Sequence, residues 1–460
     1  MQTEFSLEAA IEGLNKALQA DPKNAEIHCK LAIALAEQGN SSAAIESYQA
    51  AINIDPRHIP ALNNLGSIYR SLGRTEEALS VFAQVIKFEQ NDVSAYVNLG
   101  SLFKEKGDIS ASEMHYRKAL SLTPADYDAN FNLANALRYE GDLNIAIECY
   151  ERAIRVEANF PVAHYYLANA LKDAGRMLPA INSYSEVISL VGDPSFLASS
   201  AMQMYRMSVA HKAECLYALD ETVDLRQFIQ KVTESDQSNI RLASLTAFIA
   251  HQYQEADMYP FCRDPLNWIK IFDIKPHFEN FEESRIGLIS YLNEIPQIWE
   301  PSNATTKKGY QTEDQLFNLQ NSMLKKLEEV IKLKIDEYYT EFSSRSSVFT
   351  SRWPKQGKMK SWYVRLVQGG HQDAHMHHLG WLSGVVYLKT IKYPTNREGS
   401  IEFGLHGYDY KIINDQIPNK IHQPSDGDLV LFPSSLFHKT IPIQQNIDRG
   451  VIAFDLMPDP

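Results

Sequence analysis

The chain has 460 residues, 44% hydrophobic and 22% charged, which is the composition of a folded protein too long for one hydrophobic core. No apolar run approaches the ~20 residues that span a bilayer, and the N-terminal residues lack the pattern of a signal peptide. A net charge of −13 disfavours binding by attraction to nucleic acid or anionic lipid, and four well-separated cysteines favour reduced thiols. We therefore expect a cytoplasmic protein of two or three domains, with no nucleic-acid or membrane partner.

A motif of 34 residues repeats five times without a gap from Ala25. Each unit has a leucine in its first half, a glycine near its middle and an aromatic residue in its second half. These positions are Leu31, Leu65, Leu99, Leu133 and Leu167; Gly39, Gly73, Gly107, Gly141 and Gly175; and Tyr48, Phe82, Tyr116, Tyr150 and Tyr184. Residues before Ala25 match only the second half of a unit. A fixed period of this length predicts units that pack on their neighbours.

The pattern within one unit predicts two antiparallel helices that pack closely where small residues face large ones. The glycine ends the first helix in a left-handed conformation. The array resembles tetratricopeptide repeats, which implies an all-α solenoid over residues 1–194, made of half a unit and five full repeats. Its concave groove would bind a protein or peptide partner. The alternative is an array that only supports or dimerises the rest of the chain.

The 34-residue period ends near residue 195, but helical spacing of apolar residues continues, so we interpret residues 195–272 as a helical cap and connector. One further amphipathic helix is predicted within residues 312–342. Short β-rich runs then occupy residues 361–367, 381–389, 400–405, 411–414, 428–433, 438–443 and 449–456. Such short strands predict a sandwich or barrel of the jelly-roll kind, with flanking helices, over residues 273–460.

Histidines gather within these predicted strands, at His371, His375, His377 and His378. Residues at i and i+2 of a strand point to the same face, so His375 and His377 can bind one ion together. His438, from a distant strand, would complete a three-point face. Three further coordination positions would stay open to a bidentate ligand and oxygen, which is the layout of non-haem iron oxygenases.

Residues 275–460 resemble a 2-oxoglutarate/Fe(II)-dependent oxygenase of the prolyl-hydroxylase-like branch, which forms a double-stranded β-helix. In that branch a glycine pair, here Gly369–Gly370, precedes the first ligand histidine. The resemblance implies His375, His377 and His438 as catalytic metal ligands, with Tyr387 and Arg449 binding 2-oxoglutarate. A planar guanidinium suits the far carboxylate of 2-oxoglutarate because it can donate two parallel hydrogen bonds.

The sequence departs from the family's HxD ligand pair because His377 stands where the carboxylate is usual. His371 and Asp373 also spell HxD and remain an alternative pair. If His375 and His377 are the ligands, Asp373 would orient one of the imidazoles. His378 has the opposite parity and would only line the pocket. Trp362 and Trp381 are expected to be core aromatics.

The resemblance implies an Fe(II)/2-oxoglutarate-dependent dioxygenase, and the repeat array suggests that it hydroxylates a protein or peptide substrate. Nothing in the sequence separates hydroxylation from desaturation or ring formation. One alternative is a non-enzymatic repeat scaffold with an inactive barrel. Another is a three-histidine, cupin-like dioxygenase that does not use 2-oxoglutarate. Arg449 and Tyr387 argue against the inactive barrel, which needs no cosubstrate anchor. Arg449 also discriminates against the cupin-like dioxygenase, which would not need it.

Overall fold

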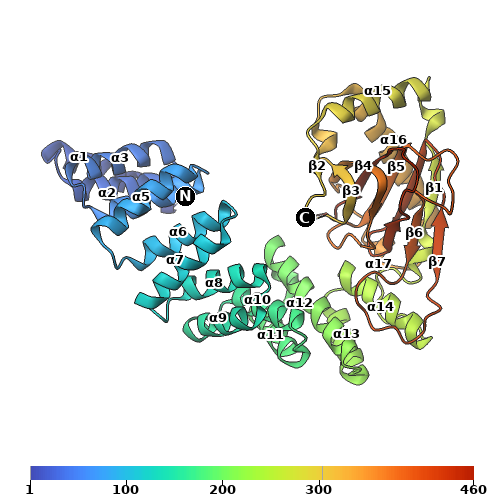
Figure 1. Ribbon diagram of the computed structural model, residues 1–460, viewed down its shortest axis with the longest axis horizontal. Coiled ribbons are helices and arrows are strands. Elements are labelled where there is room, and N and C mark those ends of the chain that lie inside the picture. The colour runs from blue at the N-terminus through green and yellow to red at the C-terminus, as the bar shows by residue number, and fades with distance from the viewer. Residues whose placement is uncertain (1, 303, 460) are drawn as a thin grey trace. The chain divides into compact units, whose positions relative to one another are not determined.

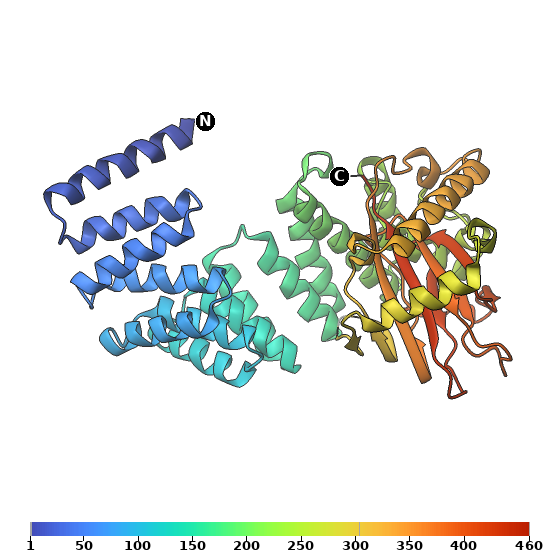
Figure 2. The ribbon, with the colours of Figure 1, turned by 90° about the horizontal axis from the view of Figure 1, so that it is seen from above.

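The computed structural model describes residues 2–302 and 304–459, with side chains from residue 7 onward. The chain forms two compact units, Met1–Leu190 and Val191–Pro460. Figures 1 and 2 show the first unit in blue to green and the second in green to red. The domain boundaries predicted after residues 194 and 272 remain predictions. No described helix is long and apolar enough to cross a membrane.

The first unit consists of successive antiparallel helix pairs, each packed on the next (Figure 1). Helix α1 precedes five pairs, and the division of residues 1–194 into half a unit and five full repeats remains a prediction. The helices are α1 (Gln2–Ala20), α2 (Ala25–Glu37), α3 (Ser41–Ile54), α4 (Ile59–Ser71), α5 (Thr75–Phe88), α6 (Val93–Glu105), α7 (Ile109–Leu122), α8 (Tyr127–Glu140), α9 (Leu143–Val156), α10 (Pro161–Asp173) and α11 (Met177–Val191).

Two features of the repeat explain these pairs. At the helix turns, the five repeated glycines all have positive φ, between 70° and 93°, as the sequence predicts. Within the pairs, the aromatic ring of the second helix lies against a small residue of the first. A Cβ atom on Gly66 would lie 2.7 Å from Phe82, and one on Gly100 would lie 2.6 Å from Tyr116. Small residues therefore allow the buried rings to fill the seam.

The second unit begins with three helices, α12 (Ser199–Ala218), α13 (Thr222–Ser235) and α14 (Ile240–Tyr253), which we call the connector helices. Helix α12 packs against both α13 and α14. The chain then passes through a proline-containing segment into the β-rich part. That part also carries α15 (Phe281–Glu294), α16 (Ser322–Phe342) and the short α17 (Val348–Ser351). The helix predicted within 312–342 is therefore found, starting later than its sequence pattern suggests.

Two antiparallel sheets form the β-rich part. The large sheet has the order β1-β8-β5-β10-β4-β3-β2, and the small sheet has the order β7-β6-β9. The strands are β1 (Lys270–Asp273), β2 (Ile298–Trp299), β3 (Thr306–Gln311), β4 (Met359–Gln372), β5 (Leu382–Lys389), β6 (Ile401–Gly404), β7 (Asn419–His422), β8 (Asp428–Pro433), β9 (Phe437–Thr440) and β10 (Arg449–Leu456). From β4 onward the chain passes back and forth between the sheets, which is the arrangement of the expected jelly roll.

The core lies between the two sheets. Every residue of β10 is buried, and Phe403 of the small sheet contacts Phe432 of the large sheet with ring centroids 4.9 Å apart. The prediction of a strand at residues 411–414 is wrong, because these residues form no strand in the structure. The backbone there bonds to the connector helices, since Gln252 Oε1 accepts the N–H groups of Ile413 and Asn414 at 2.6 and 2.8 Å. Those groups are therefore unavailable to a sheet.

Candidate metal centre

Three histidines from two segments far apart in the sequence meet inside the jelly roll. His375 follows β4, His377 comes two residues later, and His438 lies in β9. His375 and His438 form an antiparallel bridge in which each backbone N–H donates to the other's carbonyl, at 3.0 and 2.9 Å. This bridge fixes the register between the two segments, so the sheet itself brings the side chains together.

The three side chains surround a common point. One ring nitrogen from each of His375, His377 and His438 lies within 4.8 Å of the other two. The ring centroids are 4.3 Å apart for His375 and His438, and 5.1 Å apart for the other two pairs. This triangle allows a single divalent ion to be approached from all three rings.

The outer nitrogens of two rings are held by backbone carbonyls. His375 Nδ1 lies 2.7 Å from the carbonyl oxygen of Asp373, and His438 Nδ1 lies 3.3 Å from that of Leu436. A carbonyl oxygen can only accept, so each Nδ1 carries the proton and each Nε2 keeps its lone pair. The Asp373 backbone therefore orients His375, whereas its carboxylate lies 3.4 Å from His371 Nε2.

His377 is held by a carboxylate that the sequence analysis did not identify. Its Nδ1 lies 2.6 Å from Asp455 Oδ1, and Ser383 Oγ donates to the same oxygen at 2.6 Å. Ser434 bonds to Ser383 at 2.8 Å and completes a buried network. Asp455 and Arg449 are six residues apart on one strand and so share a face. The even spacing from Arg449 could therefore have identified Asp455 from the sequence as a residue that faces the site.

Two of the three histidines, His375 and His438, favour the neutral form of the ring. Burial, followed by the proximity of His377, lowers the pKa of His375 to about 3. Burial and the neighbouring rings also lower the pKa of His438 well below its usual value. A neutral ring with a free Nε2 lone pair is the form that binds a metal ion.

A buried arginine and tyrosine lie beside the cluster. Arg449 is 2% exposed, and its guanidinium carbon lies 5.0 Å from the centroid of the Tyr387 ring. Among the described residues, Arg449 Nε and Nη1 and the Tyr387 hydroxyl have no hydrogen-bond partner. Unsatisfied buried donors of this kind are costly, so the pair is suited to an anionic ligand with oxygen acceptors.

The protonation states of this pair suit the same role. Burial lowers the pKa of Arg449, and Tyr387 opposes that effect. Burial raises the pKa of Tyr387 to about 12, against the effect of Arg449. At neutral pH the tyrosine is therefore a hydroxyl donor beside the guanidinium group.

A narrow cavity of about 20 Å³ is lined by all five of the site residues predicted from the sequence, His375, His377, Tyr387, His438 and Arg449. Space of this size holds about one water molecule. Side chains around the cavity must therefore shift before it admits a ligand as large as a five-carbon dicarboxylic acid.

The remaining candidates lie elsewhere. His371 is outside the three-histidine cluster, and His378 lines a different pocket. Trp381 is a buried core aromatic, as predicted, and its indole N–H donates to the Phe349 carbonyl at 2.9 Å. Trp362 differs from the expectation, because it lines the cavity with its ring centroid 5.6 Å from that of His377.

Family models match segments of both parts of the chain. Residues 360–455 match the family described as "Putative 2OG-Fe(II) oxygenase". Residues 6–39 and 134–175 match a TPR repeat model, and residues 35–101 and 93–126 match two tetratricopeptide repeat models. The family implies iron and 2-oxoglutarate as cofactors. No curated protein sequence matches the chain.

Several solved structures are similar to part of the chain. The crystal structure of MamA is 22% identical, covers 35% of this chain and 94% of its own, and has a TM-score of 0.33. PilF of Pseudomonas aeruginosa is 20% identical, with coverages of 45% and 91% and a TM-score of 0.39. YrrB, described as a TPR protein with an unusual peptide-binding site, is 18% identical, with coverages of 39% and 93% and a TM-score of 0.34.

Proposed function

We propose that this chain, which joins tetratricopeptide repeats to an oxygenase-family domain, is a 2-oxoglutarate- and Fe(II)-dependent dioxygenase that hydroxylates a protein or peptide substrate. The observation that carries the proposal is one cavity lined both by three histidines and by the buried Arg449 and Tyr387, whose Nε, Nη1 and hydroxyl groups have no hydrogen-bond partner among the described residues. A metal-binding face and an anion-binding pair in one enclosed space are what this chemistry requires.

The residues fit an Fe(II) ion. His375, His377 and His438 would hold it through their Nε2 atoms, because their Nδ1 atoms are engaged by Asp373, Asp455 and Leu436. Bound iron, with oxygen and 2-oxoglutarate, would supply the oxidation of a substrate C–H bond. The protein's own contribution is to hold the three rings in place before the metal binds.

The donor groups also suit 2-oxoglutarate, which would enter once the side chains around the cavity shift. Arg449 and Tyr387 present unpaired donors to the cavity, and these would bind the carboxylate remote from the metal. Both side chains are buried, so the bond would form away from competing water. Closure of the cavity by Trp362 and the strands would keep bulk water from the reacting atoms.

The repeat array supports a protein or peptide substrate. Within the first unit, a groove of about 820 Å³ is lined by half-buried aromatic and amide side chains and by the exposed Tyr139. Its lining includes Phe131, Asn132, Asn135, Tyr139 and Tyr166. Aromatic rings and amides bind extended peptides by stacking and by hydrogen bonds to the backbone. We propose that this groove recruits the substrate.

The test is an anaerobic titration of the Fe(II)-loaded protein with 2-oxoglutarate, followed by visible absorption. The expected result is a charge-transfer band that is absent in His375→Ala and weakened in Arg449→Ala. His371→Ala is the matched control, and it should retain the band because His371 lies outside the cluster.

The other outcomes identify the alternatives. Bound metal without a band would contradict the use of 2-oxoglutarate and favour a three-histidine dioxygenase of the cupin kind. A protein that binds no metal would be a repeat scaffold with an inactive barrel. Loss of the band in His371→Ala but not in His377→Ala would instead identify His371 and Asp373 as the ligand pair.

A further inference from the structure

Ion pairs link neighbouring helix pairs of the repeat array. A basic residue recurs every 34 residues, at Arg70 of α4, Lys104 of α6 and Arg138 of α8. An acidic residue occupies the next repeat position on α6 and on α10, as Glu105 and Asp173. Because each helix pair packs on the next, this spacing brings the cation of one pair to the acid of the following pair.

Two of these ion pairs form. Arg70 lies 2.8 and 2.7 Å from Glu105 Oε1 through its Nε and Nη2 atoms. Arg138 donates to Asp173 Oδ2 through the same two atoms, at 3.2 and 2.7 Å. At both of these positions the array therefore places a carboxylate against the recurring cation.

Lys104 lies between them in the series but has no carboxylate partner. The position that would supply one is occupied by Tyr139, whose side chain is 81% exposed. Among the described residues, no hydrogen bond or ion pair engages Lys104, and its neighbour Glu105 is bonded to Arg70. The series of ion pairs is therefore interrupted at Lys104.

The interruption lies in the groove of the first unit described above, which we call the repeat groove. Lys104, Arg138, Tyr139 and Asp173 all line it. Of the described residues in that lining, Asp173 alone carries a carboxylate, and Arg138 already binds it. The repeat groove thus presents one uncompensated positive charge.

Partial burial makes this charge costly. Lys104 is half-buried, and burial lowers the pKa of its ammonium group, while Glu105 opposes that effect and Arg70 adds to it. A carboxylate bound beside the ammonium group would offset the cost of burial.

The groups around Lys104 suit the same kind of ligand. Asn135 Oδ1 accepts a hydrogen bond from the Tyr150 hydroxyl at 2.7 Å, so the Nδ2 group of Asn135 is left as a donor. Phe131 and Tyr166 form an edge-to-face pair with ring centroids 5.7 Å apart. The groove therefore offers N–H donors for oxygen atoms beside a surface for an apolar side chain.

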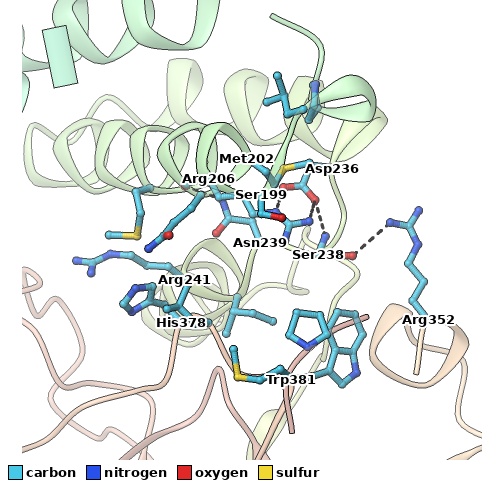
Figure 3. Close-up of a pocket in the computed structure, with 18 of the residues that line it drawn as sticks. Ser199, Met202, Arg206, Asp236, Ser238, Asn239, Arg241, Arg352, His378 and Trp381 are labelled. Atoms are coloured by element: carbon cyan, nitrogen blue, oxygen red, sulfur yellow. Dashed lines mark hydrogen bonds and ion pairs between the residues drawn. The ribbon is translucent and has the colours of Figure 1, made fainter. Parts of the chain in front are cut away.

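A pocket of the second unit differs from the repeat groove in its charges (Figure 3). Its Arg206 donates to both oxygens of Asp236 at 2.9 Å, and Arg352 donates to the Ser238 hydroxyl at 3.2 Å. Asp459 lines the same pocket, so charges of both signs are present there. The repeat groove has a single unpaired charge, which selects for a ligand of the opposite sign.

We infer that the repeat groove binds a segment of the substrate polypeptide through a glutamate or aspartate side chain, which takes the place of the carboxylate missing beside Lys104. The inference rests on the proposed function for its choice of a polypeptide substrate. The choice of a carboxylate rests on the array itself, which places one against the equivalent cation at Arg70 and at Arg138.

The test measures peptide binding to the full-length, metal-free protein by fluorescence anisotropy. The probes are three pools of decapeptides, labelled at the N-terminus with an uncharged dye and amidated at the C-terminus. The pools differ only in the fixed central residue, which is glutamate, glutamine or lysine, and their other positions are random but contain no acidic residue. The glutamate pool should bind about five-fold more tightly than the other two, or better.

Variants of the series identify the residue responsible. Lys104→Glu should abolish the glutamate preference, and Lys104→Arg should keep most of it. Tyr139→Glu should also abolish it, because this change supplies the carboxylate that the series lacks. Tyr139→Gln removes the ring without adding a charge and should keep the preference. Lys87→Glu, which changes an exposed lysine outside the groove by the same net charge, should leave it unchanged.

Equal affinity for the three pools, binding of none of them, or a glutamate preference that survives Lys104→Glu would overturn the inference. An equal loss in Lys87→Glu would also overturn it, because net charge alone would then explain the preference. A glutamine pool with a free C-terminal carboxylate that binds as tightly as the glutamate pool would assign the groove to chain ends instead.

The measurement needs neither metal nor 2-oxoglutarate, so it separates this inference from the proposed function. A normal charge-transfer band without a glutamate preference rejects the groove assignment alone. A glutamate preference without a band rejects the oxygenase proposal alone.

Discussion

Asp455 Oδ1 lies 2.6 Å from His377 Nδ1, which places a buried carboxylate directly behind the histidine that stands where the oxygenase family usually has a carboxylate ligand. The negative charge missing from the predicted ligand set is therefore present one imidazole ring away. A carboxylate at this place fixes the tautomer of the histidine and makes its Nε2 a stronger ligand.

Asp455→Asn should weaken Fe(II) binding about 10- to 100-fold, because the amide keeps the shape of the network but removes its charge. The measurement is competition for Fe(II) against a chromophoric chelator, under anaerobic conditions. Asp448→Asn is the matched control, since Asp448 lies 3.6 Å from Arg365 and outside the histidine network. Unchanged affinity in Asp455→Asn would mean that the carboxylate only packs against the ring.

Arg449→Met should stabilise the protein while it abolishes 2-oxoglutarate binding. A buried guanidinium without an anionic partner costs free energy, and a methionine of similar length fills the same space without that cost. We expect the free energy of unfolding of the second unit to rise by about 1–2 kcal/mol. Urea denaturation with and without 2-oxoglutarate checks this. Added 2-oxoglutarate should stabilise the wild-type protein but not the variant.

A less stable Arg449→Met protein would contradict the interpretation. It would show that the guanidinium group is already satisfied in the folded protein, and so is not kept for a ligand.

Gly100→Ala should destabilise the repeat array by about 1–3 kcal/mol, because the added methyl group would lie 2.6 Å from the buried Tyr116 ring. Gly13→Ala is the matched control. Gly13 lies within α1, and nothing lies within 4 Å of the position of its added Cβ atom. That change should stabilise α1 by up to about 1 kcal/mol through helix propensity. Thermal denaturation followed by circular dichroism distinguishes the two, and equal effects would rule out the steric explanation.

Acid should destabilise the second unit through Glu398. Burial alone would raise the pKa of this carboxyl group, but hydrogen bonds from Thr395, Gln445 and Gln444 outweigh it and lower the pKa to about 2. The depressed pKa contributes stability that is complete above the ordinary value of 4.5 and is lost as the pH falls from there to about 2.

Glu398→Gln should therefore be less stable than the wild-type protein at pH 7, and the difference should shrink as the pH falls from about 4.5 toward 2. Urea midpoints at several pH values test this. A difference that stays constant over that range would mean that the ionised carboxylate is not what holds residues 444 and 445.

Local sequence patterns were enough to predict the repeat array and most residues of the candidate site. A 34-residue period and the spacing of His375, His377 and Arg449 are local patterns, because helix and strand geometry fix which side chains share a face. The glycine turns of the repeats followed from the same reasoning. The strand predicted at 411–414 failed because its hydrogen bonds go to Gln252, a partner distant in sequence.

Contacts between groups far apart in the sequence became visible only in the folded chain. Pairing of β10 with β5, and of His375 with His438, brings Asp455 to His377 and Tyr387 to Arg449. Packing of the connector helices against the loop at residues 410–414 brings Gln252 to the N–H groups of Ile413 and Asn414. The physical reason is that sheet register and helix docking depend on contacts between segments far apart in the chain, which no local spacing encodes.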